Sequence, residues 1–280
     1  MPHAYTNGIV SFYEDAGEGP AVVLIHGQSL DLRMWQYQAP ALAAAGFRAV
    51  RYDVRGHGRS LIPPTGYTWE NYAFDLSDLL DRINVERPAA EPLGIAAAHL
   101  AGSSMGGAIA LQFAIENPQR VLSLALVDSG LPGFGYSEDV TGIVEQLRRT
   151  AETKGIDESF YRLWLSHPLF DGVRRFPDRF ALVEDIVRGY QAPQYRSVGP
   201  EPEGYEPPPI IEALPGIKAP ALVVAGEDDL QDYRLIAELL SENIPDARKI
   251  MMPGCGHLPP LEAPDAFNSL LIEFLKAHPG

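Results

Sequence analysis

Short, mostly apolar runs recur along the chain, separated by segments with a different pattern. They occupy residues 21–25, 47–52, 97–101, 122–127, 221–225 and 248–252. A continuous apolar run of this length is typical of a strand that is buried on both faces of a parallel sheet. Upstream, Asn7-Gly8 separates residues 4–6 from residues 9–14, and this dipeptide favours the tight turn of an antiparallel hairpin. The pattern therefore predicts a hairpin followed by six buried strands.

Between these runs, apolar residues recur with the period of a helix. Leu76, Leu79 and Leu80, for example, fall on one face of a helix over 72–83. Similar patterns cover 35–45, 105–116, 235–240 and 266–275. Strands that alternate with helices predict an α/β protein with a mostly parallel, doubly wound sheet.

The alternation stops between residues 132 and 215, where only helical patterns occur. The first of three carries Val140, Ile143, Val144 and Leu147 on one face, and Gly155 follows it as a stop signal. Asp157 is the expected N-cap of the second helix, and Asp178 is the expected N-cap of a third that ends at Gly189. We therefore expect a helical lid over 132–215, inserted in a core formed by 1–131 and 216–280.

Charge and composition narrow the classes of partner. The 280-residue chain has a net charge of −15, and such an acidic surface repels nucleic acid. The single cysteine, Cys255, cannot form an intrachain disulfide. The N-terminus shows no signal-peptide pattern, and no apolar run reaches the length of a membrane span. We expect a cytoplasmic monomer or homodimer that acts on a small-molecule substrate and binds neither nucleic acid nor a membrane.

Residues 102–106, Gly-Ser-Ser-Met-Gly, fit the pattern G-x-S-x-G. The apolar run before them predicts a strand, and the alanine- and glycine-rich segment after them predicts the start of a helix. In this strand–turn–helix context the central serine is held in a strained conformation with its hydroxyl exposed above the sheet. The flanking glycines let the neighbouring backbone approach closely. Ser104 is therefore the candidate nucleophile.

Three further motifs accompany the serine motif in a consistent order. They are His26-Gly27-Gln28, the D-x-R-G-x-G-x-S segment at 53–60, and Gly-Cys-Gly-His at 254–257. With these motifs the chain resembles the serine-nucleophile branch of the α/β-hydrolase superfamily over nearly its whole length outside the lid. Residues 31–35, 51–53 and 102–106 are similar to the 3-oxoadipate enol-lactonase branch, and the chain as a whole also resembles carboxylesterases. The resemblance implies an α/β-hydrolase fold with a helical lid after the sixth strand.

A serine hydroxyl becomes a good nucleophile only when a nearby imidazole accepts its proton. His257, on a loop after the last strand, can reach Ser104 in this fold. A carboxylate must orient that imidazole. The resemblance implies Asp229 for this role, while Asp128 and Asp228 remain as alternatives.

Two backbone N–H groups must stabilise the oxyanion of a tetrahedral intermediate. The resemblance assigns them to Gln28 and to Met105, the residue after the nucleophile. No histidine–carboxylate cluster has metal-ligand spacing, and we expect neither a metal nor another cofactor.

The lid contributes the expected substrate contacts. It is rich in aromatic residues, among which Trp164 is the best candidate to face the pocket, and His167 is a further candidate. The lid also carries six arginines between Arg162 and Arg196 against four acids, and one of these arginines could hold a substrate carboxylate.

A serine at position 104 argues against the dehalogenases and epoxide hydrolases of this superfamily, which use an aspartate there. The expected activity is cleavage of a carboxylic ester of a small, mostly apolar substrate, as in carboxylesterases. The alternatives are an enol-lactonase, a meta-cleavage-product hydrolase that breaks a carbon–carbon bond, and a small-ligand receptor with the same fold and little turnover.

Overall fold

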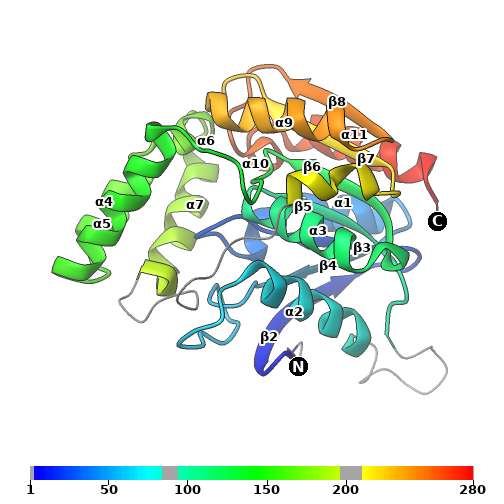
Figure 1. The fold of residues 1–280 in the computed structure, drawn as a ribbon, viewed down its shortest axis with the longest axis horizontal. Coiled ribbons are helices and arrows are strands. Elements are labelled where there is room, and N and C mark those ends of the chain that lie inside the picture. Colours follow the sequence, from blue (N-terminus) through cyan, green and yellow to red (C-terminus); the bar gives the residue numbers. More distant parts are fainter. Residues whose placement is uncertain (1–2, 84–93, 196–209, 280) are drawn as a thin grey trace.

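The computed structural model describes residues 3–83, 94–195 and 210–279. Its centre is an eight-stranded sheet in the order β1-β2-β4-β3-β5-β6-β7-β8 (Figure 1). The strands are β1 His3–Thr6, β2 Ile9–Ala16, β3 Ala21–Ile25, β4 Arg48–Tyr52, β5 Ala98–Ser103, β6 Val121–Val127, β7 Ala221–Gly226 and β8 Ala247–Met252. From β4 to β8 every neighbouring pair is parallel. The predicted mostly parallel sheet is confirmed.

The N-terminal hairpin forms at the predicted dipeptide. Thr6 pairs with Ile9, and both residues of the turn have positive φ, 41° for Asn7 and 76° for Gly8. Two positive φ values match the right-handed twist of the flanking strands, and asparagine followed by glycine tolerates them best. The hairpin adds an antiparallel edge to the sheet through β2 and β4.

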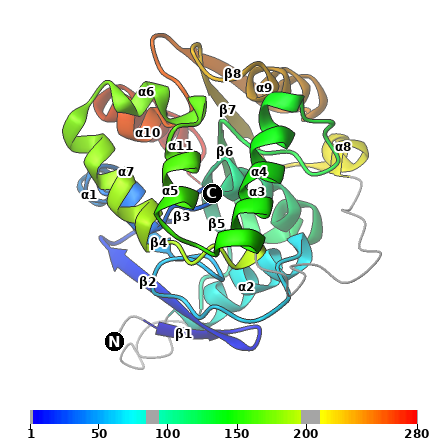
Figure 2. The same cartoon turned by 90° about the vertical axis from the view of Figure 1, so that its left-hand side faces the viewer.

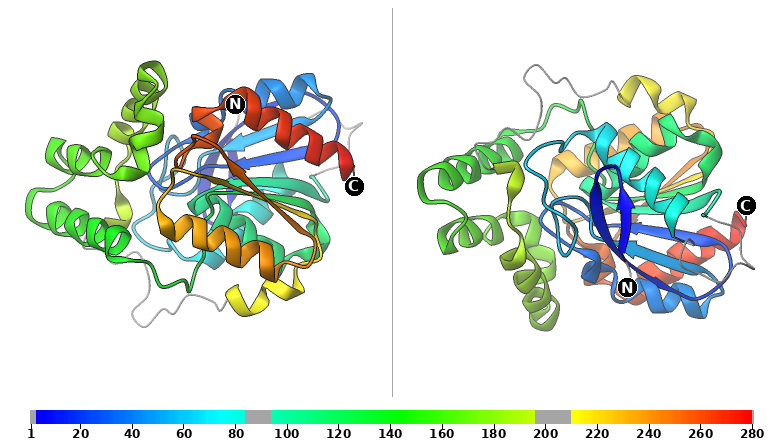
Figure 3. Two further views of the ribbon diagram at one scale, coloured as in Figure 1. Left: turned by 90° about the horizontal axis from the view of Figure 1, so that it is seen from above. Right: turned by 90° about the horizontal axis from the view of Figure 1, so that it is seen from below.

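Helices cover both faces of the sheet (Figure 3). Helices α1 and α11 pack together on one face, and α2 packs on α3 on the other. All five side chains of β3 are buried, as expected for a strand between two helical layers. The helices beside the sheet are α1 Gln38–Ala44, α2 Trp69–Arg82, α3 Met105–Glu116, α9 Gln231–Asn243 and α11 Pro264–Ala277. Two short helices pack on them: α10 Pro259–Glu262 on α11, and α8 Ile210–Ala213, which falls within the 132–215 expected for the lid, on α3.

The helices expected over 72–83 and 235–240 begin three and four residues earlier than predicted, at Trp69 and Gln231. Two further predicted helix starts are wrong because of proline. The helix expected over 35–45 is a short 3₁₀ turn, Leu32–Trp35, followed by α1. Pro40 has no N–H to donate, so it is tolerated only in the first turn, and α1 begins two residues before it. Asp178 is not an N-cap, because α7 already begins at Pro177, where proline's fixed φ suits the first helical position.

The helical insertion follows β6, as the sequence predicts, and stands to one side of the sheet (Figures 1 and 2). Gly155 ends the first helix with φ 81°, and the Asp157 carboxylate caps the second by accepting hydrogen bonds from the N–H groups of Ser159 and Phe160. Within the described ranges, every helix is too short or too polar to cross a lipid bilayer. The described helices of the insertion are α4 Glu138–Lys154, α5 Glu158–Leu165, α6 Asp171–Arg174 and α7 Pro177–Gly189.

Candidate active site

Ser104 occupies the sharp turn between β5 and α3. It has φ 53° and ψ −117°, a strained conformation for a residue with a side chain. A Cβ added to Gly102 would lie 2.2 Å from the Gly106 carbonyl oxygen, and one added to Gly106 would lie 2.1 Å from that of Ile25. Both contacts are impossible for a larger residue, so the G-x-S-x-G glycines are required by packing. The Ser104 N–H also donates to the Val127 carbonyl at 2.9 Å, which fastens the turn to β6.

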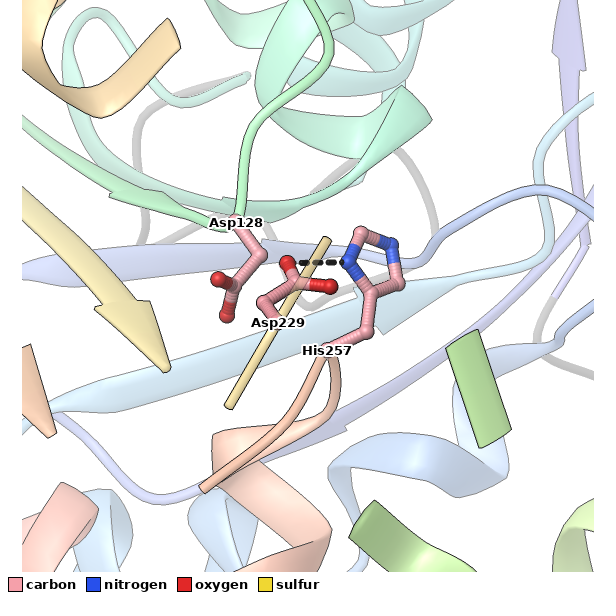
Figure 4. Close-up of side chains that lie close together, drawn as sticks. All are labelled: Asp128, Asp229 and His257. Atoms are coloured by element: carbon pink, nitrogen blue, oxygen red, sulfur yellow. Dashed lines mark hydrogen bonds and ion pairs between the residues drawn. The ribbon is translucent and has the colours of Figure 1, made fainter. Parts of the chain in front are cut away.

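His257 lies in the loop after β8 and is paired with Asp229, from the loop after β7. The imidazole Nδ1 is 2.7 Å from the Asp229 Oδ2 (Figure 4), and the two side chains are only 6% and 1% exposed. The other oxygen of Asp229 accepts the Leu230 N–H at 2.7 Å. Asp228 points away into an exposed ion pair with Arg175 at 3.1 Å. The structure therefore brings Asp229, and not Asp228, to the histidine.

Glu262 holds the loop that carries His257. It is buried, and its two oxygens accept the N–H groups on either side of the histidine, from Gly256 at 2.6 Å and from Leu258 at 2.9 Å. Because the flanking peptides are fixed, the imidazole has little freedom to turn away from Asp229. A carboxylate five residues after the histidine was visible in the sequence, but its role depends on the loop's conformation.

Asp128, the third candidate acid, directly follows β6 and is buried on the side of Asp229 that faces away from His257 (Figure 4). Its Oδ1 accepts the Gly226 N–H at 2.9 Å, while its buried Oδ2 has no donor among the described residues. Burial, and next the charge of Asp229, raise the pKa of Asp128 well above its usual value. This shift favours the neutral form of Asp128, beside the carboxylate that His257 contacts.

The side chains of Asp128, Asp229 and His257 also offer donor atoms within 4.8 Å of one another, close enough to share a metal ion. The hydrogen bond from His257 to Asp229 already accounts for their grouping.

Asp128→Asn is expected to stabilise the fold, and to do so more at higher pH. In the unfolded chain the carboxyl ionises with a pKa of about 3.9. Because its folded-state pKa is raised, unfolding at neutral pH releases a proton, and the wild type loses stability as pH rises above the unfolded value. Asparagine has no proton to lose. Its advantage in urea-unfolding free energy should grow by up to about 1.4 kcal/mol per pH unit from about pH 4, where the unfolded carboxyl ionises, up to the raised folded-state pKa.

The exposed Asp228→Asn variant is the control for this measurement. An advantage of Asp128→Asn that stays constant with pH would contradict a neutral Asp128.

The two expected oxyanion donors flank the serine. Met105 is the first residue of α3, where N–H groups have no partner within the helix. Gln28 follows β3, and its side-chain amide donates to the Tyr190 hydroxyl at 2.6 Å, which anchors the turn. A Cβ added to Gly27 would lie 3.2 Å from that of Ser104, so this turn passes close to the nucleophile.

Ser104 lies in the walls of two adjoining cavities. The small chamber has a volume of about 120 Å³ and contains Trp164 and His257 in its wall. The large chamber has a volume of about 490 Å³. The described residues that line the two chambers do not include His167. Its ring nitrogens instead contact the Leu169 N–H at 3.3 Å and the Asp139 carbonyl at 3.1 Å, so the expected substrate contact is not found there.

Sequence reasoning missed Tyr233, which stands at the centre of the site. Its ring centroid is 4.2 Å from that of His257, and its hydroxyl interacts with the side chain of Ser104. Burial raises the pKa of Tyr233 well above its usual value, so the phenol stays protonated and can donate a hydrogen bond. No motif marks this position, because the tyrosine reaches the serine only through the fold.

The described lid arginines that we expected as carboxylate ligands are engaged elsewhere. Arg162 pairs with Glu158 at 2.7 Å and Arg188 with Glu184 at 2.8 Å, while Arg179 donates to the Glu262 carbonyl at 2.6 Å. Arg196 lies outside the described residues. The arginine that lines the large chamber is Arg148 of α4, which the sequence pattern did not single out.

A strained serine turn in a doubly wound sheet shares a cavity wall with a histidine that is paired with a buried aspartate, which is the arrangement of a hydrolase-type site. Consistent with it, the sequence profile of the Alpha/beta hydrolase family matches residues 22–270. The chain therefore belongs to this family and is a hydrolase.

Individual proteins of several activities are similar to the chain. An enol-lactonase from Burkholderia xenovorans LB400 has a TM-score of 0.81 at 29% identity, covering 98% of this chain and 100% of that one. A thermophilic esterase from Thermogutta terrifontis has a TM-score of 0.82 at 25% identity, covering 99% and 98%. A 2-hydroxy-6-oxononadienedioate/2-hydroxy-6-oxononatrienedioate hydrolase from Burkholderia vietnamiensis is 29% identical over 94% of this chain and 90% of its own.

Proposed function

We propose that the chain is a serine hydrolase that cleaves the carboxylic ester of a small, mostly apolar substrate through an acyl-enzyme. The observation that carries this proposal is the geometry around Ser104. The strained serine shares a cavity wall with His257, whose Nδ1 is 2.7 Å from the buried Asp229 carboxylate. This arrangement has the parts of a nucleophile, a base and an orienting acid.

In the proposed reaction the Ser104 oxygen attacks the ester carbonyl while His257 accepts the serine's proton. The N–H groups of Gln28 and Met105 stabilise the negative oxygen of the tetrahedral intermediate. As the ester C–O bond breaks, His257 returns the proton to the leaving alcohol. Water then repeats the sequence on the acyl-enzyme, giving up its proton to His257, and releases the carboxylic acid and free Ser104. Asp229 keeps the imidazole in the tautomer that leaves Nε2 free to act as base.

A chain-length series of vinyl esters tests the preference for an apolar substrate. Each buried methylene contributes up to about 0.8 kcal/mol, so kcat/KM is expected to rise several-fold from acetate through butanoate to hexanoate until the cavity is full. Acid release at constant pH measures the rates. A steady decline from acetate to hexanoate would refute the apolar preference. Turnover below a few per minute with every ester would favour a small-ligand receptor.

The second candidate is an enol-lactonase or a carbon–carbon bond hydrolase, whose substrates carry a carboxylate. Arg148, in the wall of the large chamber, favours this second candidate. Its guanidinium lies 3.6 Å from the carboxylate of Glu145. Esters with and without a terminal carboxylate, assayed in the wild type and in Arg148→Gln, separate the two functions. This candidate comes first if the wild type has a higher kcat/KM for the carboxylate-bearing esters and Arg148→Gln lowers that preference tenfold or more. A tenfold loss corresponds to roughly one charged hydrogen bond.

A further inference from the structure

The two chambers meet at the nucleophile. Both have Gln28, Ser104, Val144, Tyr195 and Tyr233 in their walls. Beyond these shared residues their linings differ in size and in chemistry. Because the carbonyl carbon must sit on Ser104, the two halves of an ester lie one in each chamber.

The small chamber suits a short apolar group. Apart from the shared residues, its lid side is formed by aliphatic and aromatic side chains, among them Val140, Ile143 and Trp164. Its volume of about 120 Å³ is below the roughly 150 Å³ of an engineered cavity that binds benzene. A chain of a few carbons therefore fits the small chamber better than an aromatic ring does.

The large chamber suits a flat ring with hydrogen-bonding substituents. Its own lining is aromatic, with Tyr67, Trp69, Tyr72, Phe134 and Tyr136 in the wall. Burial raises the pKa of Tyr72 and of Tyr136, so their hydroxyls remain neutral donors. The described lining contains no aspartate or glutamate, and Arg148 is its charged residue. The aromatic walls suit stacking with a ring, and the tyrosine hydroxyls and Arg148 can donate hydrogen bonds to acceptor groups on it.

The position of His257 decides which half of the ester enters which chamber. His257 lines the small chamber and is not among the described residues of the large one. The leaving oxygen must receive its proton from this imidazole, so it has to face the small chamber. The acyl carbon stays bound to Ser104 with its substituent directed away from His257, toward the large chamber.

We propose that the substrate is an ester of a short, apolar alcohol with a carboxylic acid that carries an aromatic ring. This inference rests on the proposed serine mechanism and adds its substrate class and orientation. Ser104 forms a new C–O bond to the aryl-bearing acyl group, the bond to the alkoxy oxygen breaks, and that oxygen leaves as a short alcohol with the proton from His257. Water then releases the aryl acid and restores the Ser104 hydroxyl.

Two isomeric esters test the orientation directly. Propyl phenylacetate and benzyl butanoate have the same formula, and both release a primary alcohol, but they exchange the positions of the ring and the chain. We expect kcat/KM to be at least about tenfold higher for propyl phenylacetate, since one misfitted group costs that much in a closed pocket. Equal rates or the reverse preference would overturn the inference.

Propyl butanoate, which fits either orientation, separates this failure from a failure of the proposed function. If it is hydrolysed in a Ser104-dependent way while the isomers show no preference, only the orientation is wrong. If no ester is hydrolysed, the proposed function fails, and this inference with it.

Two variants assign the chambers separately. Val140→Phe narrows the small chamber and is expected to lower the kcat/KM ratio of butyl to methyl phenylacetate about tenfold. Phe134→Ala removes an aromatic wall of the large chamber and is expected to lower the ratio of propyl phenylacetate to propyl butanoate. If Val140→Phe instead changes the kcat/KM ratio between acyl groups, or Phe134→Ala changes the ratio between alcohols, the assignment of the two chambers is reversed.

Discussion

Ser104→Ala is expected to lower ester hydrolysis about 10⁶-fold, the loss found when a serine protease loses its nucleophile. Without the hydroxyl no acyl-enzyme forms, and only substrate binding and the oxyanion N–H groups still act on the carbonyl. The fold should be unaffected, because alanine has the same Cβ as serine and experiences the same strain at φ 53°. Initial rates with vinyl butanoate and the unfolding midpoint in urea measure the two effects.

Ser103→Ala is the matched control, because Ser103 adjoins the nucleophile but is fully buried in β5. Its activity is expected to remain close to that of the wild type. A fluorophosphonate reagent should label Ser104, as located by peptide mass spectrometry. Label on Ser103, or an active Ser104→Ala protein, would show that the nucleophile is misassigned.

Asp229→Asn is expected to cost about 10⁴-fold in kcat, as the same change does in a protease triad. An amide facing Nδ1 would donate a hydrogen bond to it, which favours the imidazole tautomer with its proton on Nε2. That nitrogen could then no longer accept the proton of Ser104. The 2.7 Å contact between His257 and Asp229 makes this variant a direct test of the pair.

Asp128→Asn and Asp228→Asn are the comparisons for this result. Burial and the charge of Asp229 raise the pKa of Asp128 and so favour its neutral form, and an asparagine there is expected to change kcat less than about tenfold. Asp228 is exposed and paired with Arg175, and its replacement should have no larger effect. If Asp128→Asn is the most damaging of the three, the orienting acid lies after β6 and Asp229 has another role.

The local pattern of the chain was sufficient to predict most of the fold. Apolar runs identified the parallel strands to within a residue or two, because the strands in the middle of the sheet bury most of their side chains between two helical layers. The expectation of a fully buried strand over 248–252 is wrong, since β8 lies at the edge of the sheet and most of its side chains are partly exposed. Asn7-Gly8 predicted its hairpin because few other dipeptides accept two positive φ values. The errors at Pro40 and Pro177 concern where a helix begins, which depends on a single missing N–H rather than on periodicity.

Some residues of the candidate site could likewise be predicted from local motifs, whereas others depend on contacts between distant parts of the chain. The G-x-S-x-G motif alone predicted the serine turn, and the structure gives the reason for its glycines, since a side chain at Gly102 or Gly106 would collide with neighbouring backbone. It also pointed to His257 through the motif around it. The family resemblance favoured Asp229 but left Asp128 and Asp228 open, and the tertiary structure shows which carboxylate contacts the imidazole from another loop.

The chambers were likewise decided by the fold. The sequence predicted Val140 and Ile143 on the apolar face of a helix in the insertion, and in the structure they line the small chamber. No sequence motif indicated that Tyr233 and Arg148 line the large chamber, because its wall is formed by segments that are far apart in the chain. His167 is not among the described lining residues, and its ring nitrogens contact backbone groups of the helical insertion. Periodicity reports whether a side chain is buried, whereas its neighbours are set by how the helices pack on the sheet.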